Sequence, residues 1–500
     1  MNNKPLSLTD TLIITFALLI LLGGAISLFG GDSLSGPTQV AMLLIGFTAA
    51  LVGLKNGLEW ESIEKRIVEC TSRTVGPNLI FLSIGSLIGA LMLSGAVPTL
   101  LYAGLSILSP TFFYPLSCLI CALVALSIGS SWTTAATIGV GLIGVSYGFA
   151  LSPEITAGAI ISGAYFGDKM SPLSETTNLA PAVAGSSLFP HIQHMMWVSV
   201  PSFVLCLIIF TGLGLTSTLE AGSQEQIAAF LATLDHHFSI AWYNLLPIIL
   251  LLAMAILKVP AFLAIVGGTI IAIVFAILFQ SEAIVNFANI LQPGAALDTL
   301  HFFKTLLAAL VDGFEIHTDN PAVNDLLSRG GMVSMINMVW LVLCSMMMTG
   351  VLEKVGYIQK IMNLLIVFIS STGSLIATTM ATCMSVNLLT GDQYLSLVLP
   401  GQMWKEEYKK RKLAAINLSR TLEDSGTITS PLIPWNACGV FMASTLGVAT
   451  FAYLPFCFFN LINPLIALSY GFLNIKIAPL EEPSTSESLG DSNEGLPSHA

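Results

Sequence analysis

Eight stretches of this chain are apolar for about the length that a helix needs to cross a lipid bilayer. A helix rises 1.5 Å per residue and the hydrocarbon core is about 30 Å thick, so one crossing takes roughly 20 residues. The stretches lie at about 11–30, 37–54, 76–96, 191–215, 240–257, 260–280, 331–353 and 453–473. Of the 500 residues, 54% are apolar and only 9% are charged, which is too few charges for the surface of a soluble domain. The pattern predicts an all-α polytopic membrane protein and excludes a soluble enzyme, a nucleic-acid-binding protein and a disordered chain.

The basic residues orient these spans, because lysine and arginine in short loops favour the cytoplasmic side. One basic cluster lies at 55–73 and a second at 405–412. In the segments at 216–239 and 281–330, by contrast, most of the charged residues are acidic. We therefore place both basic clusters and both termini in the cytoplasm, and both acidic segments outside. The predicted location is the inner (cytoplasmic) membrane of the cell, which the chain crosses many times.

Four further stretches do not fit single clean spans. They lie at about 111–150, 153–190, 357–400 and 409–450, and Gly, Pro, Ser, Thr or charged residues interrupt them near the membrane centre. The orientation of the neighbouring spans requires the first and third of these stretches to return to the face they enter from. We expect re-entrant hairpins there, with tips at 129–134 and 382–387, and broken transmembrane helices in the other two.

These elements follow the same order in two halves, which we predict to be inverted-topology repeats. The expected organisation is a cytoplasmic N-terminus (1–10), a first repeat (11–215), an external acidic loop (216–239), a second repeat (240–474) and a disordered acidic cytoplasmic tail (475–500). Ser171-Pro172-Leu173 in the first half aligns with Ser430-Pro431-Leu432 in the second. Inverted repeats with broken helices are typical of secondary transporters, so we expect a transporter and not an enzyme or a channel.

The hairpin tips and the helix breaks are rich in side-chain oxygens. Non-helical backbone is tolerated inside a membrane only where protein buries it or where it lines a polar cavity, so we expect all four segments to meet in the interior. Oxygen atoms are the ligands that hard cations such as Na⁺ prefer. The candidate ligands are Ser131, Thr133, Thr134, Ser171, Ser174, Thr176, Thr177, Asn178, Ser385, Asn387, Ser425, Thr427 and Ser430. For any one of these hydroxyls the alternative is a role in close helix packing.

Four acidic residues near the breaks are the more specific candidates: Asp168, Glu175, Glu423 and Asp424. A carboxylate at the bilayer centre costs roughly 2.5–3.5 kcal/mol on insertion scales, so an acid there is functional by default. Asp168 is the strongest candidate, because it lies roughly 20 Å of helix beyond the start of its crossing. A pair with the adjacent Lys169 is disfavoured, since neighbouring residues on a helix do not face each other. Asp392 is a weaker candidate that would also serve as a helix cap.

The segment G-A-Y-F-G-D-K-M-S-P-L-S-E-T-T-N-L-A at 163–180 closely resembles the hallmark stretch of the NhaC family of sodium/proton antiporters. The segment L-E-D-S-G-T-I-T-S-P-L-I-P-W-N at 422–436 is similar to the second signature of that family. The hairpin tips also resemble those of the wider ion transporter superfamily. The resemblance implies hairpins and broken helices that clasp sodium, in a transport domain that moves as an elevator against a scaffold. It also allows exchange of sodium with lactate or malate, because some NhaC-like proteins carry out that reaction.

The function expected from these features is exchange of Na⁺ for H⁺ at one shared midplane carboxylate, with Asp168 at its centre. Burial disfavours a bare carboxylate, so the site takes up a proton until Na⁺ arrives and displaces it. The empty, charged site does not cross the membrane, because an unpaired buried charge is costly. The alternative is Na⁺- or H⁺-coupled exchange of a small organic anion such as malate or lactate. No cofactor is expected; the partners are Na⁺, H⁺ and the lipid bilayer, and a homodimer is left open.

Overall fold

The computed structural model describes residues 6–216, 223–294, 298–366 and 369–480, and within these ranges the fold is helical. No β-strand forms in the described part; the only bridge of that kind joins Leu413 to Pro479. The prediction of an all-α polytopic membrane protein is therefore confirmed at the level of fold class.

Eight helical segments are long and apolar enough to cross a membrane, and two sharply bent pairs raise the total to as many as ten within the described ranges. The eight are α1 (Leu8–Phe29), α2 (Pro37–Lys55), α4 (Val75–Leu93), α6 with its first turn (Pro110–Ile128), α11 (Leu188–Thr216), α14 (Ala261–Phe279), α18 with its first turn (Val333–Val355) and α20 (Thr372–Thr390). The bent pairs join Ile227–His237 to Trp242–Ile256 and Ala437–Leu446 to Thr450–Phe456. The last predicted span is shorter than expected, because α25 covers only Phe458–Leu473.

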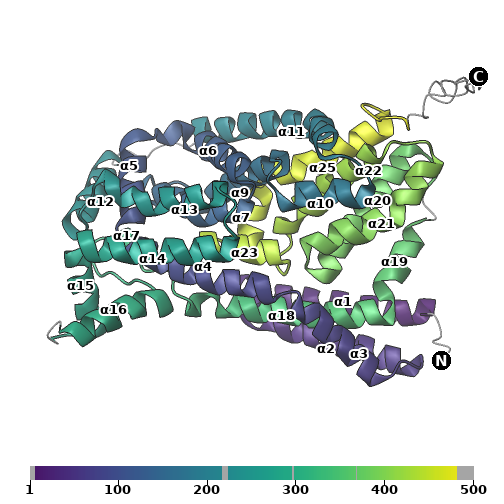
Figure 1. Cartoon of the computed structure of the whole chain (residues 1–500), viewed down its shortest axis with the longest axis horizontal. Coiled ribbons are helices and arrows are strands. Elements are labelled where there is room, and N and C mark those ends of the chain that lie inside the picture. The colour runs from purple at the N-terminus through teal and green to yellow at the C-terminus, as the bar shows by residue number, and fades with distance from the viewer. Residues whose placement is uncertain (1–5, 217–222, 295–297, 367–368, 481–500) are drawn as a thin grey trace, which may run out of the picture.

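The long helices run along the longest axis of the molecule, and different short helices gather at its two ends (Figure 1). One end holds α12 (Ser223–His237), α15 (Ser281–Leu291), α16 (Thr299–Val311) and α17 (Pro321–Leu327). The other end holds both chain ends and the amphipathic α3 (Trp60–Ser72). The two acidic segments of the sequence thus lie far from α3 and the chain ends.

The predicted acidic loop at 216–239 is not a loop over its described part. It forms α12, and Phe230 and Leu234 of this helix are buried with 3% and 0% of their surfaces exposed. Apolar side chains at helical spacing explain the difference, because they let the segment pack on the bundle instead of extending into solvent.

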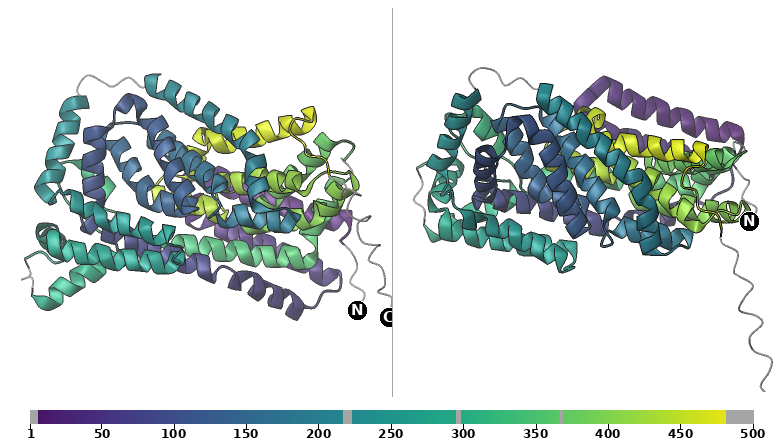
Figure 2. Two further views of the ribbon diagram at one scale, coloured as in Figure 1. Left: turned by 45° about the horizontal axis from the view of Figure 1, so that its top comes forward. Right: turned by 90° about the horizontal axis from the view of Figure 1, so that it is seen from above.

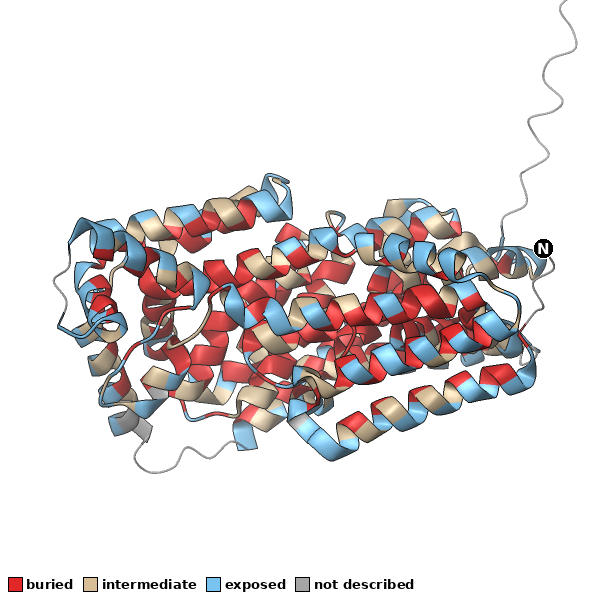
Figure 3. Cartoon of the chain, turned by 90° about the horizontal axis from the view of Figure 1, so that it is seen from below, coloured by how far each residue is buried: buried red, intermediate tan, exposed pale blue. Residues whose placement is uncertain are grey.

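Buried residues fill the middle of the bundle, and exposed residues lie on the outward faces of its outer helices (Figure 3). Many of these exposed residues are large and apolar. Leu19, Phe47 and Ile208, for example, are 64%, 61% and 60% exposed. The helix α1 lies at the outer edge of the bundle in the second view of Figure 2. An apolar outer surface is what a helix bundle presents to lipid, which has no need of charged groups there.

The two halves repeat their helix starts at a constant interval. In the first half α7 (Ser131–Thr134), α9 (Pro153–Met170) and α10 (Glu175–Ala184) follow α6. In the second half, α20 is followed by α21 (Gln393–Lys410), α22 (Ala415–Leu422) and α23 (Ala437–Leu446). Helix α21 corresponds to α7, α22 to α9 and α23 to α10, and the number of residues between the two starts is the same for each pair. The side chains that cap α7 and α10, Ser130 and Ser174, correspond in this register to the caps Asp392 and Asn436.

The first hairpin tip lies where the sequence places it, but the second does not. The helix α6 ends at Gly129, whose φ of 76° is left-handed, and α7 begins two residues later. The helix α20 instead continues through 382–387 to Thr390, and the chain turns at Gly391, with a φ of 62°. Gly391 is the first glycine after Gly373, and glycine adopts a positive φ without strain, so the turn forms there. Ser385 and Asn387 therefore lie in the last turns of a helix and not at a tip.

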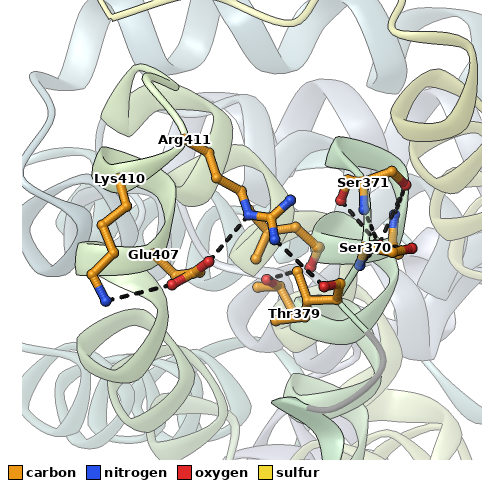
Figure 4. Close-up of polar contacts among 9 residues, drawn as sticks. Ser370, Ser371, Thr379, Glu407, Lys410 and Arg411 are labelled. Carbon is orange, nitrogen blue, oxygen red and sulfur yellow. Dashed lines mark hydrogen bonds and ion pairs between the residues drawn. The ribbon is translucent and has the colours of Figure 1, made fainter.

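The base of the second hairpin is fixed by part of the second basic cluster. Arg411 donates from Nε to Glu407 Oε1 at 3.1 Å and reaches the carbonyl of Ile369 at 3.5 Å (Figure 4). Ser371 caps the first turn of α20 beside it. These contacts hold the end of α21 next to the start of α20.

The predicted tail begins later than residue 475. Ala414 N donates to the carbonyl of Ala478 at 3.0 Å, and Leu480 N donates to that of Lys412 at 2.7 Å. Asn417 also bonds both the N–H and the carbonyl of Ala478. These paired backbone groups order residues 475–480 against the start of α22, and the rest of the predicted tail, 481–500, lies outside the described residues.

The two ends of the bundle should face opposite sides of the membrane. Glu64 on α3 and Asp235 on α12 are both exposed, and all eight native cysteines are buried. We expect Glu64→Cys to react with a membrane-impermeant maleimide only from the cytoplasm, and Asp235→Cys only from outside, since the lysine and arginine residues at 55–73 are retained inside. Labelling of intact cells against everted vesicles measures this. Reaction of both cysteines from one side would contradict the orientation.

Candidate functional site

Each hairpin tip packs against the helix break of its own half. A Cβ at Gly129 would lie 2.6 Å from the backbone of Leu173, inside the first break between α9 and α10. A Cβ at Gly391 would lie 2.9 Å from the carbonyl of Trp435, inside the second break before α23. Ala437 N also donates to the carbonyl of Gly391 at 2.9 Å. The four interrupted segments thus form two units, which we call tip-and-break units. Each consists of one hairpin tip and the helix break on which it packs.

Asp168 joins the first tip to the first broken helix. It lies in the last turn of α9, and its Oδ2 accepts hydrogen bonds from Ser131 N at 3.1 Å and from Ser131 Oγ at 2.7 Å. Ser131 begins a helical segment, so the carboxylate meets the positive end of a helix dipole. The side chain of Ser174 also lies near this carboxylate, and Asp168 is 7% exposed.

Lys169 and Asp424 form an ion pair between the two halves. Lys169 Nζ donates to Asp424 Oδ1, and both side chains are fully buried. Asn463 on α25 donates to the same oxygen at 2.9 Å. The other oxygen, Oδ2, faces Arg420 Nε at 3.9 Å, and Arg420 is 1% exposed. Removing one partner of such a pair leaves a buried charge uncompensated, so the contact binds the two breaks together.

Glu423 is the unpaired member of the group. It lies in a π-helical turn, Glu423–Thr427, that interrupts the second broken helix. Its surface is completely buried, and neither carboxylate oxygen has a hydrogen-bond partner among the described residues. The next residue in the chain, Asp424, is the partner of Lys169. Buried carboxylates normally have partners, so this residue is where a cation or a proton would have most effect.

The buried charges of this region do not sum to zero. Three carboxylates, Asp168, Glu423 and Asp424, stand against two cations, Lys169 and Arg420, when all five are ionised. The carboxylates do not converge on one point, because the described residues hold no group of three acidic, histidine or cysteine side chains placed to bind one metal ion. The region can therefore be neutralised by one monovalent cation, which the nearby hydroxyls and carbonyls would help to hold.

Glu175 lies at the edge of this region, not inside it. The side chain is exposed, and its Oε2 accepts a hydrogen bond of 2.5 Å from Tyr394 Oη on α21. The contact links the first turn of α10 to the second hairpin. Of the four predicted acids, Glu175 is the exposed one, whereas Asp168, Glu423 and Asp424 are buried.

The polar residues predicted for the second half mostly stabilise its backbone. Asn387 Nδ2 donates to the carbonyl of Gly426 at 2.6 Å and to Thr429 Oγ1 at 3.2 Å, and its Oδ1 accepts from Asn436. Ser425 and Ser430 donate to the carbonyls of Thr421 and Thr427. The hydroxyl of Thr427 is buried without a hydrogen-bond partner, while Ser385 is half-buried.

The hydroxyls predicted for the first half surround Asp168 or close the turns beside it. Ser174 caps α10 near the Asp168 carboxylate, with Thr176 Oγ1 3.2 Å from its own hydroxyl. Thr177 donates to the carbonyl of Lys169 at 3.0 Å. The remaining contacts join Ser171 to Leu173, Thr133 and Thr134 to Ser130, and Asn178 to Pro172 and Ser174.

Four residues of the site were not predicted as members from the sequence: Lys169, Arg420, Asn463 and Tyr394. Lys169 was considered only as a partner for its neighbour Asp168, whereas the partner that the fold supplies lies in the other half. A sequence signal existed for Asn463, because an Asn followed by Pro464 inside an apolar helix is a polar group that needs a partner.

The chain matches known proteins over most of its length. The model of the Na⁺/H⁺ antiporter family matches residues 163–475. The "Na(+)/H(+) antiporter NhaC" of Alkalihalophilus pseudofirmus is 38% identical over 88% of this chain and 90% of its own, and the protein of the same name from Bacillus subtilis is 37% identical over 83% and 88%. The "Malate-2H(+)/Na(+)-lactate antiporter" of Bacillus subtilis is 31% identical over 87% of this chain and 89% of its own.

The contact between Gly129 and the first break can be tested by adding one methyl group. In Gly129→Ala the left-handed conformation alone costs roughly 1–2 kcal/mol, and the Cβ meets the backbone of Leu173. We expect a lower midpoint of thermal unfolding in detergent and loss of transport. Gly212→Ala is the matched control, because that glycine lies in α11 with open space around it. Equal stability of the two variants would show that the tip does not depend on this contact.

Proposed function

The chain belongs to the Na⁺/H⁺ antiporter family, and from this premise we propose that it exchanges Na⁺ for H⁺ across the inner membrane of the cell. The observation that carries the proposal is the unpaired, fully buried Glu423, the chain neighbour of Asp424, in a region with one negative charge in excess. One Na⁺ or one H⁺ neutralises that charge. Because either ion neutralises the same negative charge, binding of one displaces the other.

Asp168 and Glu423 have different roles in this exchange. Hydrogen bonds from Ser131 and the start of α7 stabilise Asp168 in its ionised form, whereas Glu423 has no hydrogen bond that does so. In the absence of Na⁺ we therefore place the proton on Glu423. Na⁺ then enters beside Asp168, with oxygens of Ser174 and Thr176 nearby, and its charge makes ionised Glu423 tolerable, so the proton leaves.

Exchange follows if only the neutral site can change its access from one side to the other. A region with an unpaired buried charge is costly to move through a low-dielectric environment. The repeated helix starts support two inverted-topology repeats that would carry this movement, with the tip-and-break units as the moving part. Either ion gradient can then drive the other ion.

Exchange of an organic anion is the second candidate, supported by the relative named as a malate and lactate antiporter. Such an anion needs a positive partner for its own carboxylate. Lys169 already binds Asp424, and Arg420 faces the same residue and donates to the carbonyl of Lys476. With both buried cations of the region engaged, the geometry favours Na⁺/H⁺ exchange. Uptake of labelled sodium into proteoliposomes under a pH gradient, with and without malate or lactate, separates the two.

Neutral variants of the two carboxylates test the proposal. Asp168→Asn and Glu423→Gln each remove the excess negative charge, so we expect Na⁺-dependent collapse of a pH gradient in everted vesicles to be lost. Asp392→Asn is the control, because Asp392 caps α21 by accepting from Leu395 N at 2.9 Å and Asn caps helices as well. That variant should keep its activity. Normal exchange in a well-expressed Asp168→Asn variant would remove Asp168 from the mechanism.

A further inference from the structure

We propose that Lys169 is a built-in cation that fixes the number of Na⁺ ions the protein binds at one. Its ammonium group occupies Asp424, the carboxylate that would otherwise form a second ion site. The inference rests on the proposed Na⁺/H⁺ exchange and adds what sets its ion count.

The position of Lys169 makes this role specific. A lysine usually extends its charge to water along a flexible stem, yet Lys169 is completely buried one residue from Asp168. Since consecutive helical residues point in different directions, Asp168 turns to Ser131 in its own half and Lys169 turns to Asp424 in the other. Asp424 thus receives the charge of Lys169 where a free carboxylate would attract Na⁺.

A second, independent observation is a buried carboxylate without a partner beside this pair. Glu423, the residue before Asp424, is fully buried and both of its oxygens lack a hydrogen-bond partner in the described structure. Asp424 Oδ2 has no hydrogen-bond partner in the described structure, and Arg420 Nε lies 3.9 Å from it. The same turn therefore holds one carboxylate that is paired, Asp424 with Lys169 and Asn463, and one that is unpaired, Glu423.

The number of bound ions then follows from electroneutrality in a low-dielectric region. Asp168, Glu423 and Asp424 contribute three negative charges, and Lys169 and Arg420 contribute two positive ones. His191 and His194 on the neighbouring helix α11 are counted as neutral, because the ordinary pKa of histidine lies below the alkaline pH of the measurement. Glu175 is exposed and is left out. Because an uncompensated buried charge is costly, the single excess charge admits one Na⁺.

Changing either member of the pair should change that number in opposite directions. Lys169→Gln leaves two excess negative charges, so we expect two Na⁺ ions per protein at saturation. Asp424→Asn leaves none, so we expect Na⁺ binding to be lost. The double variant Lys169→Gln with Asp424→Asn restores one excess charge and should again bind one Na⁺. Lys169→Arg keeps the charge and should also bind one.

The measurement is equilibrium binding of ²²Na⁺ to purified protein at alkaline pH, counted per folded molecule after size-exclusion chromatography. A Lys169→Gln variant that still binds one Na⁺, or an Asp424→Asn variant that binds Na⁺ as the unaltered protein does, would overturn the proposal. If Lys169→Gln does not fold, the comparison of Asp424→Asn with the double variant decides, since a purely structural pair predicts no recovery of binding. Absence of Na⁺ binding in the unaltered protein would instead contradict the proposed exchange itself.

Discussion

The structure depends on one constraint: backbone that leaves the helix inside a membrane must be satisfied by the protein itself. Each hairpin tip meets this constraint by packing on the break of its own half, Gly129 on Leu173 and Gly391 on Trp435. The same constraint explains why polar side chains gather there, because Asn387 and the hydroxyls of the breaks bond the freed carbonyls. A region built to satisfy broken helices is thereby also a polar region deep in the bundle.

Charge, and not geometry alone, gives that region a function. The pair of Lys169 and Asp424 joins the two halves, and in our proposal it removes one carboxylate from competition for ions. Asp168 is held by Ser131, and Glu423 has no hydrogen-bond partner. One excess negative charge remains, which is the condition for two monovalent cations to exclude each other. In this account the NhaC-like chemistry follows from a small set of buried charges and needs no preformed metal cage.

Much of this could be predicted from the sequence, and the parts that could not have physical reasons. Apolar runs are local signals, so most of the predicted spans and the first tip at Gly129 were found, whereas the spans predicted at 240–257 and 453–473 are a bent pair and a shorter helix. The second tip was placed too early, because Ser385 and Asn387 resemble tip residues in composition, whereas the turn requires the positive φ that Gly391 supplies. The partner of Lys169 could not be predicted, since Asp424 lies 255 residues away and only the packing of the two breaks brings them together.

The most direct test of the account is the pH dependence of Na⁺ affinity, measured by calorimetry on purified protein from about pH 5.5 to about pH 9. If one proton and one Na⁺ compete for the same excess charge, the affinity should fall about tenfold for each pH unit on the acid side and level off on the alkaline side. The Glu423→Gln variant lacks the carboxylate that binds the proton, so any remaining Na⁺ affinity should no longer depend on pH. A Na⁺ affinity that does not change with pH over this range in the unaltered protein would contradict the shared site.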